Sequence, residues 1–372
     1  YTASTSWLQS ISTRFSEFAS SPPSSSLDKS KFMAVFDDLT MSILDVCRSN
    51  EMPAAGIDWI RDMIRYTVVG GKLNRGLQVI IVQRTLSKSN TLSDLEFARA
   101  SILGWSIEFL QAFFLVADDV MDDSVTRRGQ PCWYKRGEVG MIAINDSFLL
   151  ESFVFTLLKQ YFGHETYYMK LVELFINVVQ KTEFGQLLDL TSQPQENGAF
   201  KIELERFTLE RYSLIVKYKT AYYTFYLPIA IGMITSGITD EKAFKVCEEV
   251  CCAMGEYFQV QDDFLDCYGD AATIGKIGTD IQDNKCSWLI VQALKRASAK
   301  QKDVLAVNYG RDEPKKIAKV KAVYEEIGMQ KIFDQYENDS YALIQEKLGK
   351  VESFMPRDIF ELLLKKIYKR SK

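Results

Sequence analysis

Apolar residues recur at helical spacing along nearly the whole chain, and the strict alternation typical of strands is scarce. The pattern predicts helices over 31–48, 53–69, 94–123, 143–162, 167–191, 203–235 and 240–268, followed by further amphipathic helices from 286 to 369. The segment 94–123 is apolar nearly all round, which indicates a central position in a bundle. No linker interrupts 31–372, so we predict an all-α fold in a single large domain.

Residues 1–30 differ from the rest of the chain. They are rich in Ser and Thr and poor in acidic residues, and they contain a Ser-Pro-Pro-Ser-Ser-Ser run. This composition predicts a disordered leader. The remnant of an organelle-targeting segment is the alternative, although only Arg14 and Lys29 supply positive charge.

One acidic pattern occurs twice, each time at the end of a long predicted helix. The first copy runs from Phe114 to Asp122 and the second from Phe258 to Asp266, and both read F-x-V-x-D-D-x-apolar-D. Their carboxylates are Asp118, Asp119 and Asp122 in the first copy, and Asp262, Asp263 and Asp266 in the second. The first and last carboxylates of each copy are four residues apart and share a helix face, where like charges repel unless a cation joins them. Hard cations such as Mg²⁺ take carboxylate ligands together with substrate phosphates.

Basic residues are placed to accompany an anion. Lys72 and Arg75 follow Gly70-Gly71 as a helix begins, and Arg127-Arg128 follow the first acidic motif at once. A third set consists of Lys219, Lys276 and Lys285. Each set is also compatible with an ordinary solvated surface, but beside two acidic metal sites they suit a diphosphate. Asp189 follows Gly185 and Gln186 in an otherwise apolar setting, where an unpaired carboxylate is costly.

Composition and missing motifs exclude several classes of function. The net charge is −4, which gives no overall attraction to nucleic acid. Seven Cys without a C-x-x-C pair and a single His offer no zinc framework and indicate free thiols in a reducing, cytoplasmic environment. No uncharged apolar stretch of about 18 residues occurs, so we predict no transmembrane helix. There is no nucleophile–base pair and no Walker sequence, which favours metal-assisted departure of diphosphate to leave a carbocation in a dry apolar cavity.

These motifs together resemble those of the trans-prenyltransferases, of the eukaryotic farnesyl diphosphate synthase type. The resemblance covers about 32–372 and includes Arg127-Arg128-Gly129 and Gly275-Lys276-Ile-Gly278-Thr-Asp280. It implies an isoprenoid synthase fold, with about ten core helices around a deep central cavity, and a homodimer. It also implies head-to-tail condensation of isopentenyl diphosphate with dimethylallyl and geranyl diphosphate, with about three Mg²⁺ ions per active site. Mn²⁺ is the expected substitute.

The resemblance also implies roles for individual residues. Asp118, Asp122 and Asp262 would ligate Mg²⁺, with the remaining carboxylates in support: Asp119, Asp189, Asp263, Asp266 and Asp280. Arg127, Lys219 and Lys276 would contact the allylic diphosphate. Isopentenyl diphosphate would be held by Lys72, Arg75, Arg128 and Arg370. The Lys219 carbonyl, the Thr220 hydroxyl and Gln259 would stabilise the allylic cation. The departing diphosphate would take the proton, with Lys285 and Gln111 as second choices.

Phe113 and Phe114 predict the length of the product. They lie about one helical turn before Asp118, so a chain growing away from the metal site meets two rings. We therefore expect growth to stop at the farnesyl length. Two core phenylalanines are equally compatible with the pattern.

The sequence leaves three alternative functions open. A short-chain prenyl synthase with another allylic substrate or product length would share all these motifs. A terpene cyclase or squalene-type synthase would use the acidic motifs but would not need Lys72, Arg75 and Arg128. A non-catalytic prenyl-binding subunit would not need intact aspartates in both motifs.

Overall fold

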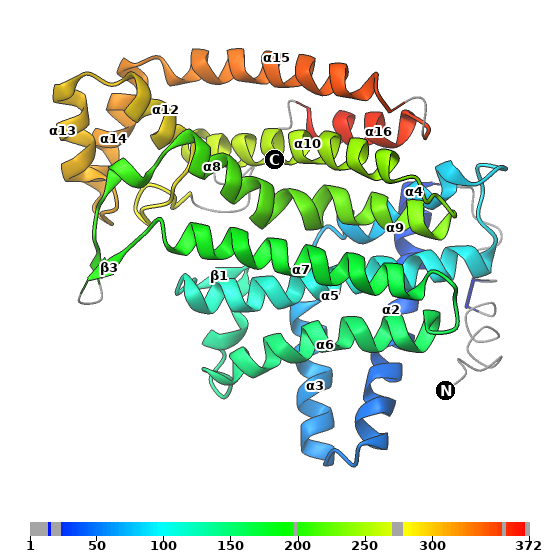
Figure 1. Ribbon diagram of the computed structural model, residues 1–372. Coiled ribbons are helices and arrows are strands. Elements are labelled where there is room, and N and C mark those ends of the chain that lie inside the picture. The colour runs from blue at the N-terminus through cyan, green and yellow to red at the C-terminus, as the bar shows by residue number, and fades with distance from the viewer. Residues whose placement is uncertain (1–13, 16–23, 197–198, 270–277, 352–354, 369–372) are drawn as a thin grey trace. The chain divides into compact units, whose positions relative to one another are not determined.

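The computed structural model describes residues 14–15, 24–196, 199–269, 278–351 and 355–368. Most of these residues lie in helices, and the only strands among them are two short antiparallel pairs (Figure 1). The all-α prediction is therefore confirmed. The chain divides into two compact units, one comprising 1–176 and 227–239 and the other 177–226 and 240–372.

The first unit contains the first acidic motif. Its elements are α2 (Ser25–Ser49), α3 (Ala54–Thr67), α4 (Asn74–Leu86), α5 (Asp94–Met121), β1 (Thr126–Arg127), β2 (Gln130–Pro131), η1 (Trp133–Lys135), α6 (Ile142–Phe162), the first part of α7 (Tyr168–Leu190), and α9 (Leu227–Thr235). Helix α2 begins earlier than the predicted boundary at residue 31, because the Ser24 hydroxyl accepts a hydrogen bond from the Leu27 amide and caps the helix.

Helix α5 is the central element of this unit. It begins with a capping box, in which the side chains of Ser93 and Glu96 each bond the other's backbone amide. Its length and composition would allow it to cross a membrane, but 78% of its most apolar window is buried inside the protein. Helices α4 and α5 cross at Gly76 and Gly104, and a Cβ at Gly104 would lie 2.5 Å from the Gly76 carbonyl oxygen. This close approach fixes the start of α4 against the middle of α5.

The second unit contains the second acidic motif. Its elements are the remainder of α7, β3 (Gln195–Glu196), β4 (Ala199–Phe200), η2 (Leu204–Arg206), α8 (Leu209–Ile215), η3 (Val216–Tyr226), α10 (Glu241–Tyr268), α12 (Trp288–Arg296), α13 (Ala299–Asn308), α14 (Pro314–Glu326), α15 (Met329–Leu348) and α16 (Asp358–Ile367). Helix α10 lies beside α15 and packs on η3 (Figure 1). A core of large side chains, including Trp288, Tyr309 and Phe333, fills the space beside α10.

The predicted helix 203–235 is not one regular helix. Residues Val216–Tyr226 form a π-helix between α8 and α9, so Lys219 and Thr220 lie in a widened backbone. Gly185 of α7 lies directly against this segment, where a Cβ would be 2.1 Å from the Lys219 amide nitrogen. Pro228 falls within α9 just after the π-helix. The predicted single helix is therefore interrupted by a change in helix type.

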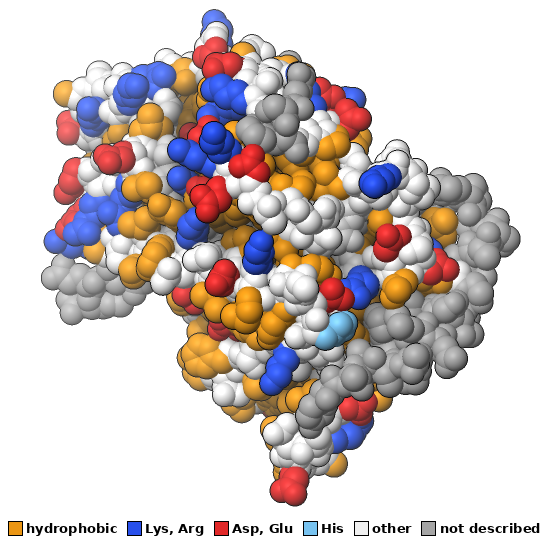
Figure 2. All heavy atoms as spheres, turned by 45° about the vertical axis from the view of Figure 1, so that its right-hand side comes forward, with side chains coloured by type: hydrophobic (Ala, Val, Ile, Leu, Met, Phe, Trp, Pro, Cys, Tyr) orange, Lys and Arg blue, Asp and Glu red, His pale blue; other side chains and the backbone are white. Residues whose placement is uncertain are grey.

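The surface carries both signs of charge. On the face shown in Figure 2, acidic and basic side chains are interspersed with exposed hydrophobic ones. This mixture agrees with a net charge close to zero for a chain of 372 residues.

Candidate active site

The first acidic motif ends α5. Asp118 and Asp122 are partly exposed on the last turns of the helix, and the Asp122 amide donates to the Asp118 carbonyl. Asp119 lies on another face and is only 3% exposed. The motif thus divides into two carboxylates that remain accessible to a cation and one that is enclosed by the protein.

Asp119 binds the first arginine of the following hairpin. Arg127 donates to Asp119 Oδ1 from Nε at 3.0 Å and from Nη2 at 2.5 Å, and its Nη2 lies 3.6 Å from Asp118 Oδ2. Burial works against the charge of Arg127, but the hydrogen bond to Asp119 and the attraction of the Asp119 and Asp118 carboxylates together outweigh it and raise the pKa of the guanidinium. The buried carboxylate therefore holds Arg127 beside Asp118, at the edge of the expected metal site.

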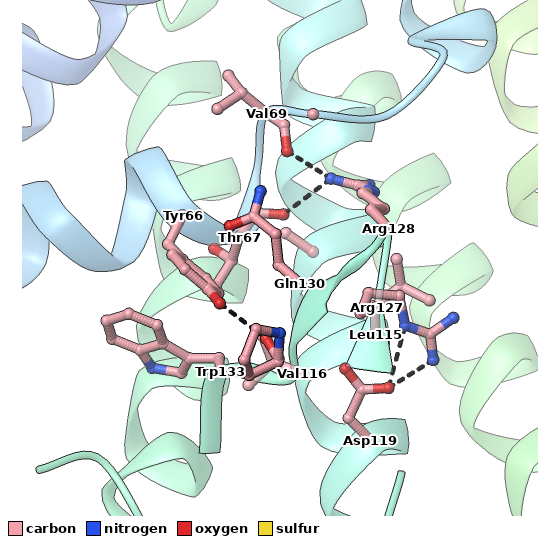
Figure 3. A pocket seen from close by; sticks show the side chains of 13 residues that line it. Tyr66, Thr67, Val69, Leu115, Val116, Asp119, Arg127, Arg128, Gln130 and Trp133 are labelled. Carbon is pink, nitrogen blue, oxygen red and sulfur yellow. Dashed lines mark hydrogen bonds and ion pairs between the residues drawn. The ribbon is translucent and has the colours of Figure 1, made fainter. Parts of the chain in front are cut away.

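Arg128 turns the other way, as Figure 3 shows. Its backbone has a φ of 55°, in the left-handed region, and its Nη1 donates to the carbonyl oxygens of Thr67 at 3.2 Å and Val69 at 2.6 Å. A Cβ at Gly71 would lie 3.0 Å from Arg128 Nη2. The Gly70-Gly71 turn therefore closes over a guanidinium, which gives a steric reason for glycine at position 71.

The same guanidinium lines a small pocket in the first unit. The pocket has a volume of about 40 Å³, and its lining joins α3, α5 and the β1–β2 hairpin through Tyr66, Leu115, Asp119, Arg127, Arg128 and Trp133 (Figure 3). The Tyr66 hydroxyl donates to the Pro131 carbonyl at 2.8 Å and fixes the hairpin against α3. Both arginines of the expected diphosphate set thus border one concave surface.

Two polar side chains of the apolar helix α5 support the predicted isopentenyl diphosphate residues. Gln111 Oε1 accepts a hydrogen bond from Arg75 Nη1 at 2.9 Å. Glu108 is 2% exposed, and its Oε1 accepts from the Gly76 amide at 2.8 Å in the first turn of α4. Burial raises the pKa of Glu108, while the Gly76 amide and the nearby arginines lower it. Glu108 thus caps α4 and anchors the turn that carries Arg75.

Sequence reasoning assigned no role to Glu108. A role for Glu108 could have been inferred from its position among apolar residues of a core helix. A carboxylate is rarely buried there without a hydrogen-bond partner. Lys72, which precedes the same turn, has an exposed side chain. The structure therefore places Lys72, Arg75 and Arg128 around one turn, which is hydrogen-bonded to α5 through Glu108 and Gln111.

Phe113 and Phe114 lie about one helical turn before Asp118 on α5, as the sequence predicted. Their ring centroids are 4.7 Å apart with the planes inclined by 39°. Phe113 is 7% exposed and Phe114 is partly exposed. The pair therefore forms a contiguous aromatic surface on α5, although its part in product length stays a prediction.

The second acidic motif lies at the end of α10. The carboxylate of Asp266 accepts backbone hydrogen bonds from Thr279 at 3.3 Å and Asp280 at 3.1 Å. Gly278 is in such close contact that a Cβ there would overlap the Asp266 carbonyl oxygen. Asp266 thus binds the backbone of Thr279 and Asp280, and Asp262, on the preceding turn of α10, is partly exposed.

Two lysines surround Asp189 in the second unit. Lys219 Nζ lies 2.6 Å and Lys285 Nζ lies 3.7 Å from Asp189 Oδ2. Burial alone would raise the pKa of Asp189, but the two ammonium groups outweigh it and lower the pKa to about 2. The expected cationic set therefore has a buried counter-ion, which positions Lys219 and Lys285 together.

Thr220 of η3 forms a hydrogen-bonded chain with Gln259 and Asp263 of α10. Thr220 Oγ1 donates to Gln259 Oε1 at 3.3 Å, and Gln259 Nε2 donates to Asp263 Oδ1 at 2.9 Å. Asp263 is 5% exposed, and burial raises its pKa to about 7, although a hydrogen bond from the Trp288 amide acts against the rise. Lys276 and Arg370 lie outside the described residues.

The donor set fits a hard cation. In each unit, two carboxylates four residues apart end a helix with accessible side chains, which are the oxygen ligands that Mg²⁺ takes together with phosphate. Within the ranges that the structure describes, no three His, Cys, Asp or Glu side chains converge as a preformed cage.

Comparisons with known proteins identify the family. The polyprenyl synthetase family model matches residues 57–327. Farnesyl diphosphate synthase of Dictyostelium discoideum is 50% identical over 346 residues, covering 91% of this chain and 89% of that protein. Farnesyl pyrophosphate synthase of Homo sapiens is 49% identical over 313 residues, covering 84% of this chain and 74% of that protein.

A solved structure shows the same fold. Farnesyl diphosphate synthase of T. brucei, complexed with risedronate, superposes with a TM-score of 0.84 at 39% identity, covering 93% of this chain and all of that one. These matches confirm the resemblance that the two acidic motifs indicated. The chain therefore belongs to the polyprenyl synthetase family.

Proposed function

We propose that the chain is a farnesyl diphosphate synthase, which condenses isopentenyl diphosphate with dimethylallyl and then geranyl diphosphate. The observation that carries the proposal is the cationic turn of the first unit, where Arg75 and Arg128 are anchored on the structure that carries Asp118 and Asp122. A terpene cyclase needs no such second diphosphate site. The farnesyl synthases at 45–50% identity support the same reaction.

The residues supply binding, orientation and charge. Asp118, Asp122 and Asp262 would hold Mg²⁺, which when bound supplies positive charge against the diphosphate of the allylic substrate. Arg127, fixed by Asp119, and Lys219, fixed by Asp189, add positive charge to the same diphosphate. Preorganised charges of this kind stabilise a leaving group without reorganisation during the reaction.

Isopentenyl diphosphate would bind Lys72, Arg75 and Arg128 on the first unit. As the allylic diphosphate departs, the oxygen dipoles of Thr220 and Gln259 and the Lys219 carbonyl stabilise the developing cation. The new double bond forms when a proton leaves, and the departing diphosphate is its acceptor. Gln111 is less suited to this role, because its oxygen already accepts from Arg75.

One assay tests the reaction. The protein is incubated with labelled isopentenyl diphosphate, dimethylallyl diphosphate and Mg²⁺, and the products are separated by length. Farnesyl diphosphate is the expected product, and turnover should stop with EDTA. Absence of condensation would overturn the proposal, and EDTA-resistant turnover would overturn the metal role.

A matched pair of lysines at the two ends of α4 tests the isopentenyl site. Lys72→Ala should raise the KM for isopentenyl diphosphate about tenfold or more, the loss of one charged contact, with a smaller effect on the allylic substrate. Lys88→Ala, at an exposed lysine just beyond the end of α4, should leave both KM values unchanged. Equal effects of the two variants would show that Lys72 acts only through general surface charge.

We also propose that the protein is a homodimer. Ile144 and Phe148 lie four residues apart on one face of α6 and are 44% and 60% exposed, and exposed apolar side chains of this kind mark interaction surfaces. Phe148→Glu should convert the dimer to monomers in light-scattering measurements.

A cytoplasmic location is supported by seven free cysteines, which suit a reducing compartment.

A further inference from the structure

Asp263 connects the end of one helix to a side chain of the proposed reaction centre. Its Oδ2 accepts a hydrogen bond from the Trp288 amide at 2.7 Å, and its Oδ1 accepts from Gln259 Nε2 at 2.9 Å. Gln259 Oε1 in turn accepts from Thr220 Oγ1 at 3.3 Å. Both carboxylate oxygens of Asp263 therefore accept hydrogen bonds from other groups of the protein.

The Trp288 amide fixes one side of this arrangement. Trp288 is the first residue of α12, and its N-cap Ser287 makes no side-chain capping bond. The first amides of a helix have no partner within the helix, and a carboxylate is favourable there. Asp263 fills this place from α10, so the orientation of its carboxyl plane is set by the packing of α12 against α10.

The carboxylate then sets the direction of the Gln259 amide. Both Asp263 oxygens accept hydrogen bonds from protein groups, so Gln259 presents its NH₂ group to Asp263 and its carbonyl oxygen to Thr220. The opposite orientation would place two acceptor oxygens against each other. We propose that Asp263 is a positioning residue that fixes the Gln259 amide with its oxygen toward Thr220, where the negative end of the dipole favours the allylic cation. This inference rests on the proposed function, which assigns Gln259 and Thr220 to that cation.

Asp263→Asn tests the proposal because it should reverse the amide. The Trp288 amide requires an acceptor, so the introduced asparagine would turn its oxygen to Trp288 and its NH₂ group to Gln259. Gln259 would then flip and direct its own NH₂ group toward Thr220 and the cation. We expect kcat to fall about 10²-fold, the scale of one preorganised dipole in a dry site, with the KM of both substrates changed by less than about threefold. The melting temperature should stay near that of the wild type, because the Trp288 bond is kept.

A second substitution should rescue the first. In the double variant Asp263→Asn, Gln259→Glu, one carboxylate oxygen accepts from the asparagine and the other faces Thr220. We expect kcat to recover to within about tenfold of the wild type. Gln259→Glu alone places two carboxylates together and should remain slow. A purely structural role of Asp263 gives no reason for the second change to repair the first.

The cycle is completed with Gln259→Met, which removes the amide at similar size. Adding Asp263→Asn to Gln259→Met should cause little further loss of kcat, because no dipole remains to be reversed. A wild-type kcat in Asp263→Asn, or no recovery in the double variant with glutamate, would overturn the inference. Both results are read against an active wild type, whereas an inactive wild type would instead refute the proposed function.

Discussion

The aromatic pair on α5 gives the sharpest prediction for product length. Phe113→Ala, Phe114→Ala removes two rings whose centroids are 4.7 Å apart. Both residues lie about one turn from Asp118, and one helical turn rises about 5.4 Å, close to the length that a five-carbon unit adds to an extended prenyl chain. Opening one turn of space should therefore let the product grow by one such unit, to geranylgeranyl diphosphate.

The energetic cost of this variant has to be separated from its effect on the product. Truncating a buried Phe typically costs about 3–5 kcal/mol, and partly exposed Phe114 should cost less than Phe113. Phe97→Ala is the matched control, because Phe97 lies near the start of the same helix, is 3% exposed and packs against Phe15 at 5.5 Å. It should lower the melting temperature comparably without altering product length.

The assay is chromatography of the labelled products after extended incubation with isopentenyl diphosphate. A longer product from the double variant, together with the farnesyl product from Phe97→Ala, would support the role of the pair. If the folded double variant still releases only the farnesyl product, the floor of the pocket lies elsewhere and the reasoning is refuted.

Three further predictions concern the support of the charged residues. Gly71→Ala should raise the KM for isopentenyl diphosphate about tenfold, measured by steady-state kinetics, since its Cβ would lie 3.0 Å from Arg128 Nη2. Glu108→Ala should lower the free energy of unfolding by about 1–3 kcal/mol in urea titrations, because the Gly76 amide loses its partner, whereas Glu108→Gln keeps an acceptor and should cost less. The pKa of Asp189 is lowered from 3.8 to about 2. Its ionised form therefore contributes about 2 kcal/mol of stability above pH ~4, and this contribution is lost as the pH falls toward 2. The difference in unfolding free energy between the wild type and Asp189→Asn should shrink over that pH range.

The helices that carry the acidic motifs were readable from the sequence because their signals are local. The predicted segments 94–123 and 240–268 correspond to α5 at Asp94–Met121 and α10 at Glu241–Tyr268. In α5 the capping box and the apolar run agree, so the boundary is set within a few residues. Repeated carboxylates at helical spacing then indicated a cation without any knowledge of the fold.

The features that could not be predicted from the sequence depend on contacts between segments that are distant along the chain. The π-helix has no sequence signal of its own, because it is coupled to the close approach of Gly185 to the Lys219 backbone. Likewise, the spacing of Arg127 and Arg128 could not show that one binds Asp119 and the other the Val69 carbonyl. The left-handed backbone of Arg128 separates the two guanidinium groups, and it arises from the hairpin.

The crossing of α4 and α5 has a mechanical consequence. Backbone meets backbone at Gly76 and Gly104, and the Phe32 ring packs against both glycines, so the two helices have no space there to slide past each other. The turn with Arg75 and the end of α5 with Asp118 therefore move as one rigid body whenever the enzyme opens or closes. We therefore expect any motion that admits substrate to occur outside this crossing, and the spacing between the cationic turn and the first acidic motif to stay constant.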